Sequence, residues 1–279
     1  MSVFDKRQCA LGEGPLWHPE RKQLFWFDIL GKRLLSRTAD GPLEWRFQSH
    51  VAVAGWVDHD TLIIVSETTL LRFDIPTGKT SPLLDLEADK PATRPHDGRA
   101  DPFGGLWIGT IGKGVEAGAG SLYRYYRGEI TQLKTGMTLP NSICFSPDGR
   151  TAYYAETTDQ RILRQPLDAQ GWPMGAAQVL IDLSDEELRP DGAAMDSDGC
   201  LWVACWNAGK VLRITAEGVI CGAVSLPALK LTRTEFGGSD LTTLFVTSGA
   251  MGSSEPHAGQ TFAISSGAVG LAQPRVILG

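Results

Sequence analysis

The 279-residue chain lacks any apolar stretch of about 18 residues, the length that a membrane-spanning helix needs. Its first residues, MSVFDKRQ, contain no apolar core of signal-peptide length. Charge of one sign is not concentrated, because 26 Lys and Arg stand against 32 Asp and Glu, a formal net charge of −6, and no basic stripe occurs. We therefore expect a cytoplasmic protein whose main partner is neither nucleic acid nor a membrane.

Cysteine is scarce, and its spacing excludes the common cysteine motifs. The five cysteines are Cys9, Cys144, Cys200, Cys205 and Cys221, and no two of them form a CxxC pair. An odd number without a secretory signal predicts free thiols in a reducing compartment. Buried small hydrophobic residues are the simplest interpretation of these side chains.

Several catalytic signatures are also missing. The chain has no GxSxG nucleophile elbow, no Walker phosphate loop and no GxGxxG motif after a strand. No window of about twelve residues has the period of an amphipathic helix. The remaining composition, 42% hydrophobic and 21% charged, is that of an ordinary globular protein. These absences favour an all-β fold whose chemistry uses none of the common nucleophile or nucleotide motifs.

A turn rich in Asp, Pro and Gly, followed by a hydrophobic strand, recurs six times along the chain. The first apolar residues of the six strands are Leu24, Leu62, Leu106, Ala152, Leu201 and Leu244. Their spacing of roughly 38–49 residues is typical of a four-stranded propeller blade. We therefore predict an all-β protein, a six-bladed β-propeller of four-stranded blades in one domain over residues 1–279. A pair of β-sandwiches or a different blade count is the alternative.

Four of the repeats share a template that begins with a polar residue. They are residues 13–20, 96–103, 141–148 and 191–198. Glu13, Asn141 and Asp191 stand at the first position of three of them, and His96 stands there in the fourth. Because the innermost strands of a propeller line a central channel, we expect this position just before each innermost strand, at one mouth of the channel. Glu13, Asn141 and Asp191 should therefore meet near the axis.

Two carboxylates and an amide oxygen that meet at one point form a site for a hard cation. Taken singly, each residue also fits a turn, since Asn and Asp side chains stabilise turns. Their shared register favours the joint interpretation, because two neighbouring buried carboxylates are unfavourable unless a cation neutralises them. The oxygen ligands fit Ca²⁺, Mg²⁺, Mn²⁺ or Zn²⁺, and three protein ligands leave coordination positions open, as catalytic sites do.

Three further residues are candidates for substrate contacts. His96 could be a ligand, a proton shuttle or a hydrogen-bond partner, and we favour substrate contact. Arg94 carries a planar cation that suits a ligand rich in hydroxyl groups or bearing a carboxylate, although a surface arginine is the alternative. Glu116 lies in the Gly-rich segment 112–120, which could fold over the channel mouth as a lid or remain a solvated loop.

Five motifs, in order along essentially the whole chain, resemble the regucalcin (senescence marker protein)/gluconolactonase family. They are LGEGPLW at 11–17, RPHDG at 94–98, GSLY at 120–123, LPN at 139–141 with FSPDG at 145–149, and PDG at 190–192 with LW at 201–202. The resemblance implies a six-bladed propeller with one divalent metal in the channel. It also implies that the protein hydrolyses sugar lactones to aldonic acids. The chain is more similar to bacterial pentono- and hexonolactonases than to the animal protein.

The resemblance also assigns residues. The positions that match the family's metal ligands are Glu13, Asn141 and Asp191. The positions that match its substrate contacts are Arg94, His96 and Glu116. His96 departs from the pattern, since the family often has Asn there, and this departure bears on which substrate is bound more than on the reaction class.

The predicted function is the metal-dependent hydrolysis of a small sugar lactone by a monomer or weak homo-oligomer. The ion would polarise the lactone carbonyl, and Asp191 is the preferred general base. The alternatives are a propeller hydrolase of aryl esters or phosphotriesters and a non-catalytic calcium-binding propeller. Two acidic ligands and open metal positions favour an enzyme over the last of these.

Overall fold

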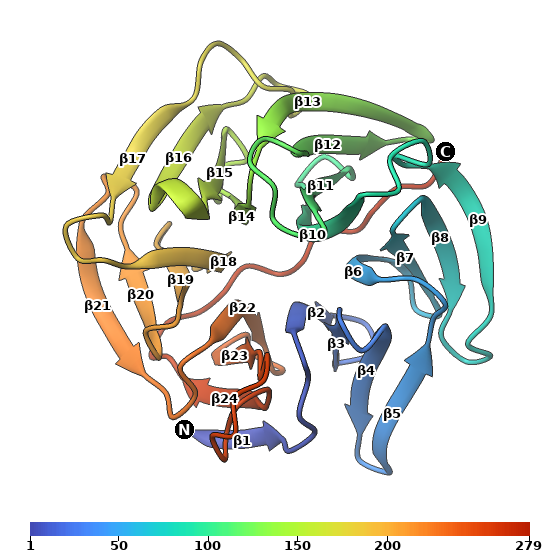
Figure 1. Cartoon of the computed structure of the whole chain (residues 1–279), viewed down its shortest axis with the longest axis horizontal. Coiled ribbons are helices and arrows are strands. Elements are labelled where there is room, and N and C mark those ends of the chain that lie inside the picture. Colours follow the sequence, from blue (N-terminus) through green and yellow to red (C-terminus); the bar gives the residue numbers. More distant parts are fainter.

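The computed structural model describes all residues, 1–279, as six four-stranded antiparallel sheets arranged in a ring (Figure 1). The first three blades comprise β2 (Gly12–His18), β3 (Gln23–Asp28), β4 (Arg33–Thr38) and β5 (Gly41–Arg46); β6 (Val51–Asp58), β7 (Thr61–Ser66), β8 (Thr69–Asp74) and β9 (Thr80–Asp85); and β10 (Thr93–Ala100), β11 (Leu106–Gly112), β12 (Gly120–Tyr126) and β13 (Glu129–Met137). The next two comprise β14 (Pro140–Phe145), β15 (Thr151–Glu156), β16 (Arg161–Pro166) and β17 (Gln178–Asp182); and β18 (Arg189–Met195), β19 (Leu201–Trp206), β20 (Lys210–Ile214) and β21 (Ile220–Ser225). The predicted six-bladed propeller is confirmed.

The sixth blade joins the two ends of the chain. It combines β22 (Leu231–Gly237), β23 (Thr243–Ser248) and β24 (Thr261–Ser265) with β1 (Ser2–Asp5), which pairs antiparallel to β24. The N-terminal strand thus becomes the outer strand of the last blade, beside the N label in Figure 1. This pairing closes the ring and leaves no blade short of its outer strand.

The one helix is the 3₁₀ turn η1 (Thr157–Asp159). This turn lacks the length and the apolar character that a helix needs to cross a bilayer.

The second strand of each blade is the most apolar because it lies inside the blade and between neighbouring blades. Every residue of β3 and of β7 is buried. A strand covered on both faces reads as a continuous apolar run rather than as an alternation. The outer strands β5, β9 and β21 have no buried residue and are mostly exposed.

One detail of the sequence prediction is wrong. The hydrophobic strands used to align the repeats are the second strands of the blades, and the residues expected just before the innermost strands lie within those strands. Glu13 lies in β2, His96 in β10, Asn141 in β14 and Asp191 in β18. The innermost strands are rich in Gly, Pro and polar residues, as in TRPHDGRA of β10, so their sequences resemble turns.

Each innermost strand is interrupted by a β-bulge close to these positions. A bulge turns backbone groups away from the ladder and re-aims the neighbouring side chains. Side chains of the adjacent blade bind some of these groups. The Ser142 hydroxyl donates to the Asp191 carbonyl oxygen, the Thr232 hydroxyl donates to the Gly12 carbonyl oxygen at 2.5 Å, and the Ile143 amide donates to the Asp97 carboxylate at 2.9 Å. These bonds hold the innermost strands in register around the axis.

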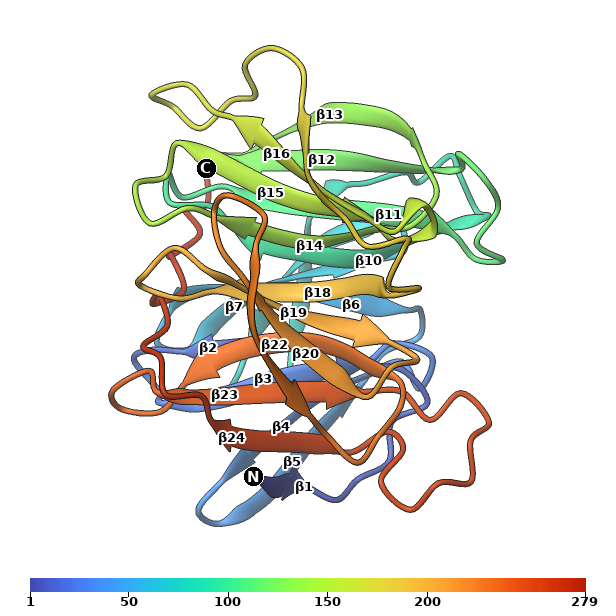
Figure 2. The same cartoon turned by 90° about the vertical axis from the view of Figure 1, so that its left-hand side faces the viewer.

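After β24, residues 266–279 cross one end of the channel. Figure 1 shows this segment, in red, passing across the centre of the ring, and Figure 2 shows it along one face. The Leu271 amide binds the Met195 carbonyl in the fifth blade at 3.2 Å, and the Val276 amide binds the Trp56 carbonyl in the second blade at 2.9 Å. Gln273 donates to both carboxylate oxygens of Glu235, at 2.8 and 2.7 Å. This end of the channel is therefore covered.

Candidate metal and substrate site

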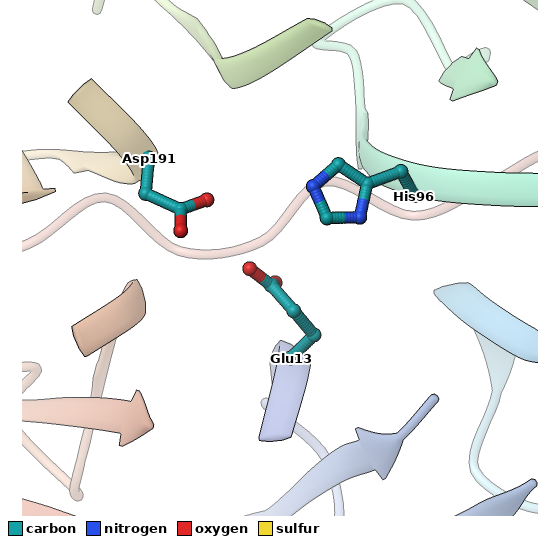
Figure 3. A group of neighbouring side chains, drawn as sticks. All are labelled: Glu13, His96 and Asp191. Atoms are coloured by element: carbon teal, nitrogen blue, oxygen red, sulfur yellow. The ribbon is translucent and has the colours of Figure 1, made fainter. Parts of the chain in front are cut away.

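Four side chains of the innermost strands converge at the other end of the channel. Suitable ligand atoms of Glu13, His96 and Asp191 all lie within 4.8 Å of one another, and all three residues are buried. Figure 3 shows these three side chains pointing toward one another from separate strands. Asn141 lines the same cavity as His96 and Asp191. The structure therefore brings together the three residues predicted as metal ligands.

Local hydrogen bonds orient the carboxylate of Glu13. Its Oε2 accepts a hydrogen bond from the Gly14 amide at 2.7 Å. Gly14 has a φ of 54°, and a Cβ at this position would collide with the Ala52 carbonyl of the neighbouring innermost strand. Glycine is therefore required for the turn that aims Glu13 at the axis.

The amide of Asn141 is oriented by Thr157, a residue of η1 that the sequence did not suggest. The Thr157 hydroxyl donates to the Pro190 carbonyl at 2.6 Å, so its oxygen can accept a hydrogen bond from Asn141 Nδ2, at 2.9 Å. This pair directs the nitrogen of the amide away from the centre and leaves Oδ1 facing inward. A Thr in a polar turn carries no sequence signal for this role.

Three oxygen atoms at the centre have no hydrogen-bond partner. They are Glu13 Oε1, Asn141 Oδ1 and Asp191 Oδ1, all buried. A buried acceptor without a partner costs about 1–3 kcal/mol, so three of them in one place call for an electropositive partner. Two carboxylate oxygens and one amide oxygen are the donors that a divalent cation prefers. The donor set therefore fits the metal that the sequence predicts.

The electrostatics of the two carboxyl groups agree with this fit. Burial raises the pKa of Glu13 to about 7, although Arg233 and the Gly14 amide act in the opposite direction. Burial, and next the neighbouring Glu13 carboxylate, raises the pKa of Asp191 well above its usual range. The Arg233 side chain packs against Gly192, and its guanidinium group is paired with Asp97. The carboxylates thus lack sufficient positive charge of their own.

Arg94 differs from every other buried arginine in the protein. Arg99, Arg124 and Arg233 each form an ion pair with a carboxylate. Arg94 is 6% exposed, and its Nη1 donates only to the Pro95 carbonyl at 3.0 Å and to His96 Nδ1 at 3.4 Å. Burial lowers the pKa of Arg94 to about 10 despite the carboxylates of Glu13 and Glu67. Its cation is therefore available to a ligand in the cavity.

His96 is buried beside Arg94. Burial, followed by the charges of Arg94 and Arg233, holds the pKa of the His96 imidazole well below its usual range. The ring is therefore neutral at physiological pH.

A cavity of about 310 Å³ lies above the four converging side chains. This volume is at the lower end of the roughly 300–1,000 Å³ found for small-molecule sites. Arg94, His96, Asn141 and Asp191 form its polar part, and the apolar part includes Leu139 and Trp206.

Glu116 is not brought to the cavity with the other candidates. Its carboxylate accepts a hydrogen bond from the Gly114 amide at 3.1 Å, within its own loop, and its side chain is exposed. Its neighbour Val115 lines the cavity instead. The loop therefore does reach the mouth, while the predicted contact of Glu116 with substrate requires a change in this side chain's direction.

Stability without metal should fall as pH rises. The pKa of Glu13, raised from 4.5 to about 7, means that the metal-free folded protein binds this proton more tightly than the unfolded chain does. The stabilisation is present below the unfolded pKa and is lost as pH rises through about 7. A divalent ion replaces the proton, so the metal-induced rise in Tm should be larger at about pH 7.5 than at about pH 5.

The measurement is thermal unfolding with and without a divalent ion at both pH values. Glu13→Gln removes both this proton and one anionic ligand, so it should show little metal-induced rise in Tm at either pH. Equal rises in Tm at the two pH values in the wild-type protein would contradict the prediction.

Comparison with known proteins agrees with this architecture. The profile of the family described as SMP-30/Gluconolactonase/LRE-like region matches residues 11–250. The chain is 31% identical over 279 residues to 6-deoxy-6-sulfogluconolactonase of Pseudomonas putida, with 96% of each chain covered. It is 32% identical over 260 residues to pentonolactonase XacC of Haloferax volcanii, with 90% of this chain and 86% of that protein covered.

A solved structure gives the same result. The crystal structure of a calcium-binding protein, regucalcin, from Agrobacterium tumefaciens matches with a TM-score of 0.96 and 34% identity, covering 99% of this chain and 97% of that one. The family profile spans the strands that carry Glu13, Asn141 and Asp191. The protein is a member of the SMP-30/gluconolactonase/LRE-like family.

Proposed function

We propose that the protein hydrolyses sugar lactones to aldonic acids with one divalent metal ion held by Glu13, Asn141 and Asp191. The observation that carries this proposal is the set of three buried oxygens without partners on Glu13, Asn141 and Asp191, the last two of which line a small-molecule cavity. The lactonase relatives, at 31% and 32% identity, support the substrate class.

The residues of the site have separate roles. When bound, a divalent ion supplies Lewis-acid polarisation of the lactone carbonyl. Asp191 accepts the proton of the attacking water, since a carboxylate has a second oxygen beside the one directed at the ion. Arg94, His96 and Glu116 contact the substrate, with Glu116 turning from its own loop toward the cavity.

The oxygen donors indicate a class of ion, the hard divalent cations, rather than one particular ion. Oxygen donors suit Ca²⁺, Mg²⁺ and Mn²⁺, and Zn²⁺ also binds such sets. The similar structure from Agrobacterium tumefaciens is that of a calcium-binding protein, which supports Ca²⁺ as the first ion to test.

Acid release from a panel of aldonolactones tests the proposal. The purified protein is treated with a chelator, and a pH indicator then follows hydrolysis before and after addition of Ca²⁺, Mg²⁺, Mn²⁺ or Zn²⁺. Aryl esters and phosphotriesters form the comparison panel. We expect turnover of five- or six-carbon lactones that depends on added metal. Hydrolysis of the comparison panel alone, or equal turnover without metal, would reject the proposal.

His96→Asn should redistribute kcat/KM among lactones rather than abolish hydrolysis. An imidazole and an amide offer different hydrogen bonds to a bound lactone, and an unpaired hydrogen-bonding group costs about 1–3 kcal/mol. Shifts of roughly ten- to a hundredfold between epimeric lactones are therefore expected. The bound metal is measured in the same preparations and should stay unchanged. Loss of metal would make His96 a ligand, and equal loss on every lactone would show that its contact does not discriminate among substrates.

A further inference from the structure

The ring of His96 is the one part of the converging group that is not an oxygen ligand. Its side chain lies on β10 with that of Arg94, and both line the cavity. Figure 3 shows the imidazole directed into the gap between Glu13 and Asp191, with one ring nitrogen toward Asp191. The hydrogen-bonding character of that nitrogen decides what the ring does.

Arg94 determines this character. Its Nη1 lies 3.4 Å from Nδ1 of His96. A guanidinium group only donates hydrogen bonds, so Nδ1 must accept and cannot carry a proton. A neutral imidazole has one N–H, and that N–H must then be at Nε2. An imidazolium is disfavoured, because its Nδ1–H would point at the N–H of the Arg94 guanidinium.

The surroundings favour the same neutral form. The ring is 6% exposed, and the guanidinium groups of Arg94 and Arg233 oppose a further positive charge.

We propose that His96 is a catalytic residue that presents a neutral Nε2–H to the lactone carbonyl oxygen, and that Arg94 is a positioning residue that fixes this tautomer. The choice of the lactone carbonyl oxygen as the acceptor rests on the proposed function. A neutral imidazole whose pKa is lowered can donate a hydrogen bond to a carbonyl oxygen and polarise it, as a histidine of triosephosphate isomerase does.

The step is balanced without proton transfer from His96. The water oxygen forms a bond to the carbonyl carbon, and the C=O π electrons move to the carbonyl oxygen, which becomes an oxyanion. Asp191 takes the proton of the water, and Nε2–H strengthens its hydrogen bond to the oxyanion. The oxyanion electrons then re-form the C=O bond while the acyl C–O bond to the ring oxygen breaks, and the ring oxygen takes up the proton from Asp191. The products are a hydroxyl group and a carboxylic acid.

Ligation of the metal by His96 is the rival arrangement, since its ring lies among the possible ligands. A ligating Nε2 needs a lone pair, which would move the proton to Nδ1. That N–H would then face the N–H of Arg94, and two donors would be opposed at 3.4 Å. The contact with Arg94 therefore favours His96 Nε2 as a hydrogen-bond donor over His96 Nε2 as a metal ligand.

Nitrogen-15 NMR of the histidine rings distinguishes the two arrangements. The chain has five histidines, so loss of one ring pattern in His96→Asn assigns the signal. We expect a protonated Nε2 and an unprotonated Nδ1, both without metal and after addition of Ca²⁺ or Zn²⁺. In Arg94→Met the signals should move toward a mixture of tautomers. A protonated Nδ1, an imidazolium, or loss of the Nε2 proton on adding metal would overturn the inference. An unchanged tautomer in Arg94→Met would remove the positioning role of Arg94.

Kinetics test the catalytic role separately. His96→Leu should lower kcat by about a hundred- to a thousandfold with little change in KM, since the lost donor acts mainly on the transition state. His96→Asn keeps an N–H donor and should lose much less. An unchanged kcat in His96→Leu would overturn the role. Absence of lactone hydrolysis with the expected tautomer would reject the proposed function and the catalytic role together, whereas hydrolysis with a protonated Nδ1 would reject this inference alone.

Discussion

Asp191→Ala is expected to lower kcat/KM for sugar lactones by at least about a thousandfold and to lower the bound metal in parallel. The change removes one of the two anionic donors and the preferred general base at once. Glu13 and Asn141 would remain, which is fewer protein ligands than a catalytic metal site normally has. Turnover and metal content, measured on the same preparation, report the two losses.

The control for this variant is Asp185→Ala, an exposed acid that has no ion pair. It should keep both activity and metal. The loss in Asp191→Ala should not reflect unfolding, because it removes a buried carboxyl group whose pKa is raised by burial. Without metal, the variant should therefore be at least as stable as the wild-type protein. Survival of both turnover and metal content would place the site elsewhere.

Arg124→Met is expected to lower the free energy of unfolding by about 3–5 kcal/mol. Arg124 Nε and Asp101 Oδ2 are 2.7 Å apart, and both side chains are fully buried in the third blade. The guanidinium group also lies over the rings of Tyr126 and Trp172, at 4.5 and 4.3 Å from their centroids. Removal of the arginine leaves the Asp101 charge buried without its partner, and that uncompensated charge is the main cost.

Denaturant unfolding, with the metal content held equal, measures this effect. Arg161→Met is the matched control, because Arg161 pairs with Asp182 at the same kind of distance, 2.8 Å, but with 51% and 38% of the side chains exposed. An exposed pair contributes at most about 1 kcal/mol, so this variant should be nearly neutral. Equal losses in the two variants would show that burial does not determine the contribution of the pair.

The fold could be predicted from the sequence because propeller repeats are local. Leu24, Leu106 and Leu201 begin strands of the same kind after the same kind of turn, and the first five blades are each built from consecutive hairpins. The innermost strands were harder to identify. Their bulges and their polar, glycine-rich sequences remove the alternation by which a strand is usually identified.

The grouping of Glu13, Asn141 and Asp191 was also predictable, since equivalent positions in repeats around an axis must lie near that axis. Their roles as ligands remain predictions. The contribution of Thr157 was not predictable, because it depends on a hydrogen bond to a carbonyl of the next blade. Glu116 is similar, since the direction of its side chain in the Gly-rich loop is set by local contacts such as the one with the Gly114 amide.

By itself, then, the sequence determined the repeat, the blade number, the family and which three oxygen-bearing residues share one position in the repeats, because each of these depends on short motifs and their spacing. Only the tertiary structure decided that Glu13, Asn141 and Asp191 each keep one buried oxygen without a partner. It also decided that Arg94 alone among the buried arginines lacks a carboxylate and faces His96. Hydrogen-bond partners and burial depend on atoms from strands far apart in the chain, which meet only when the ring has closed.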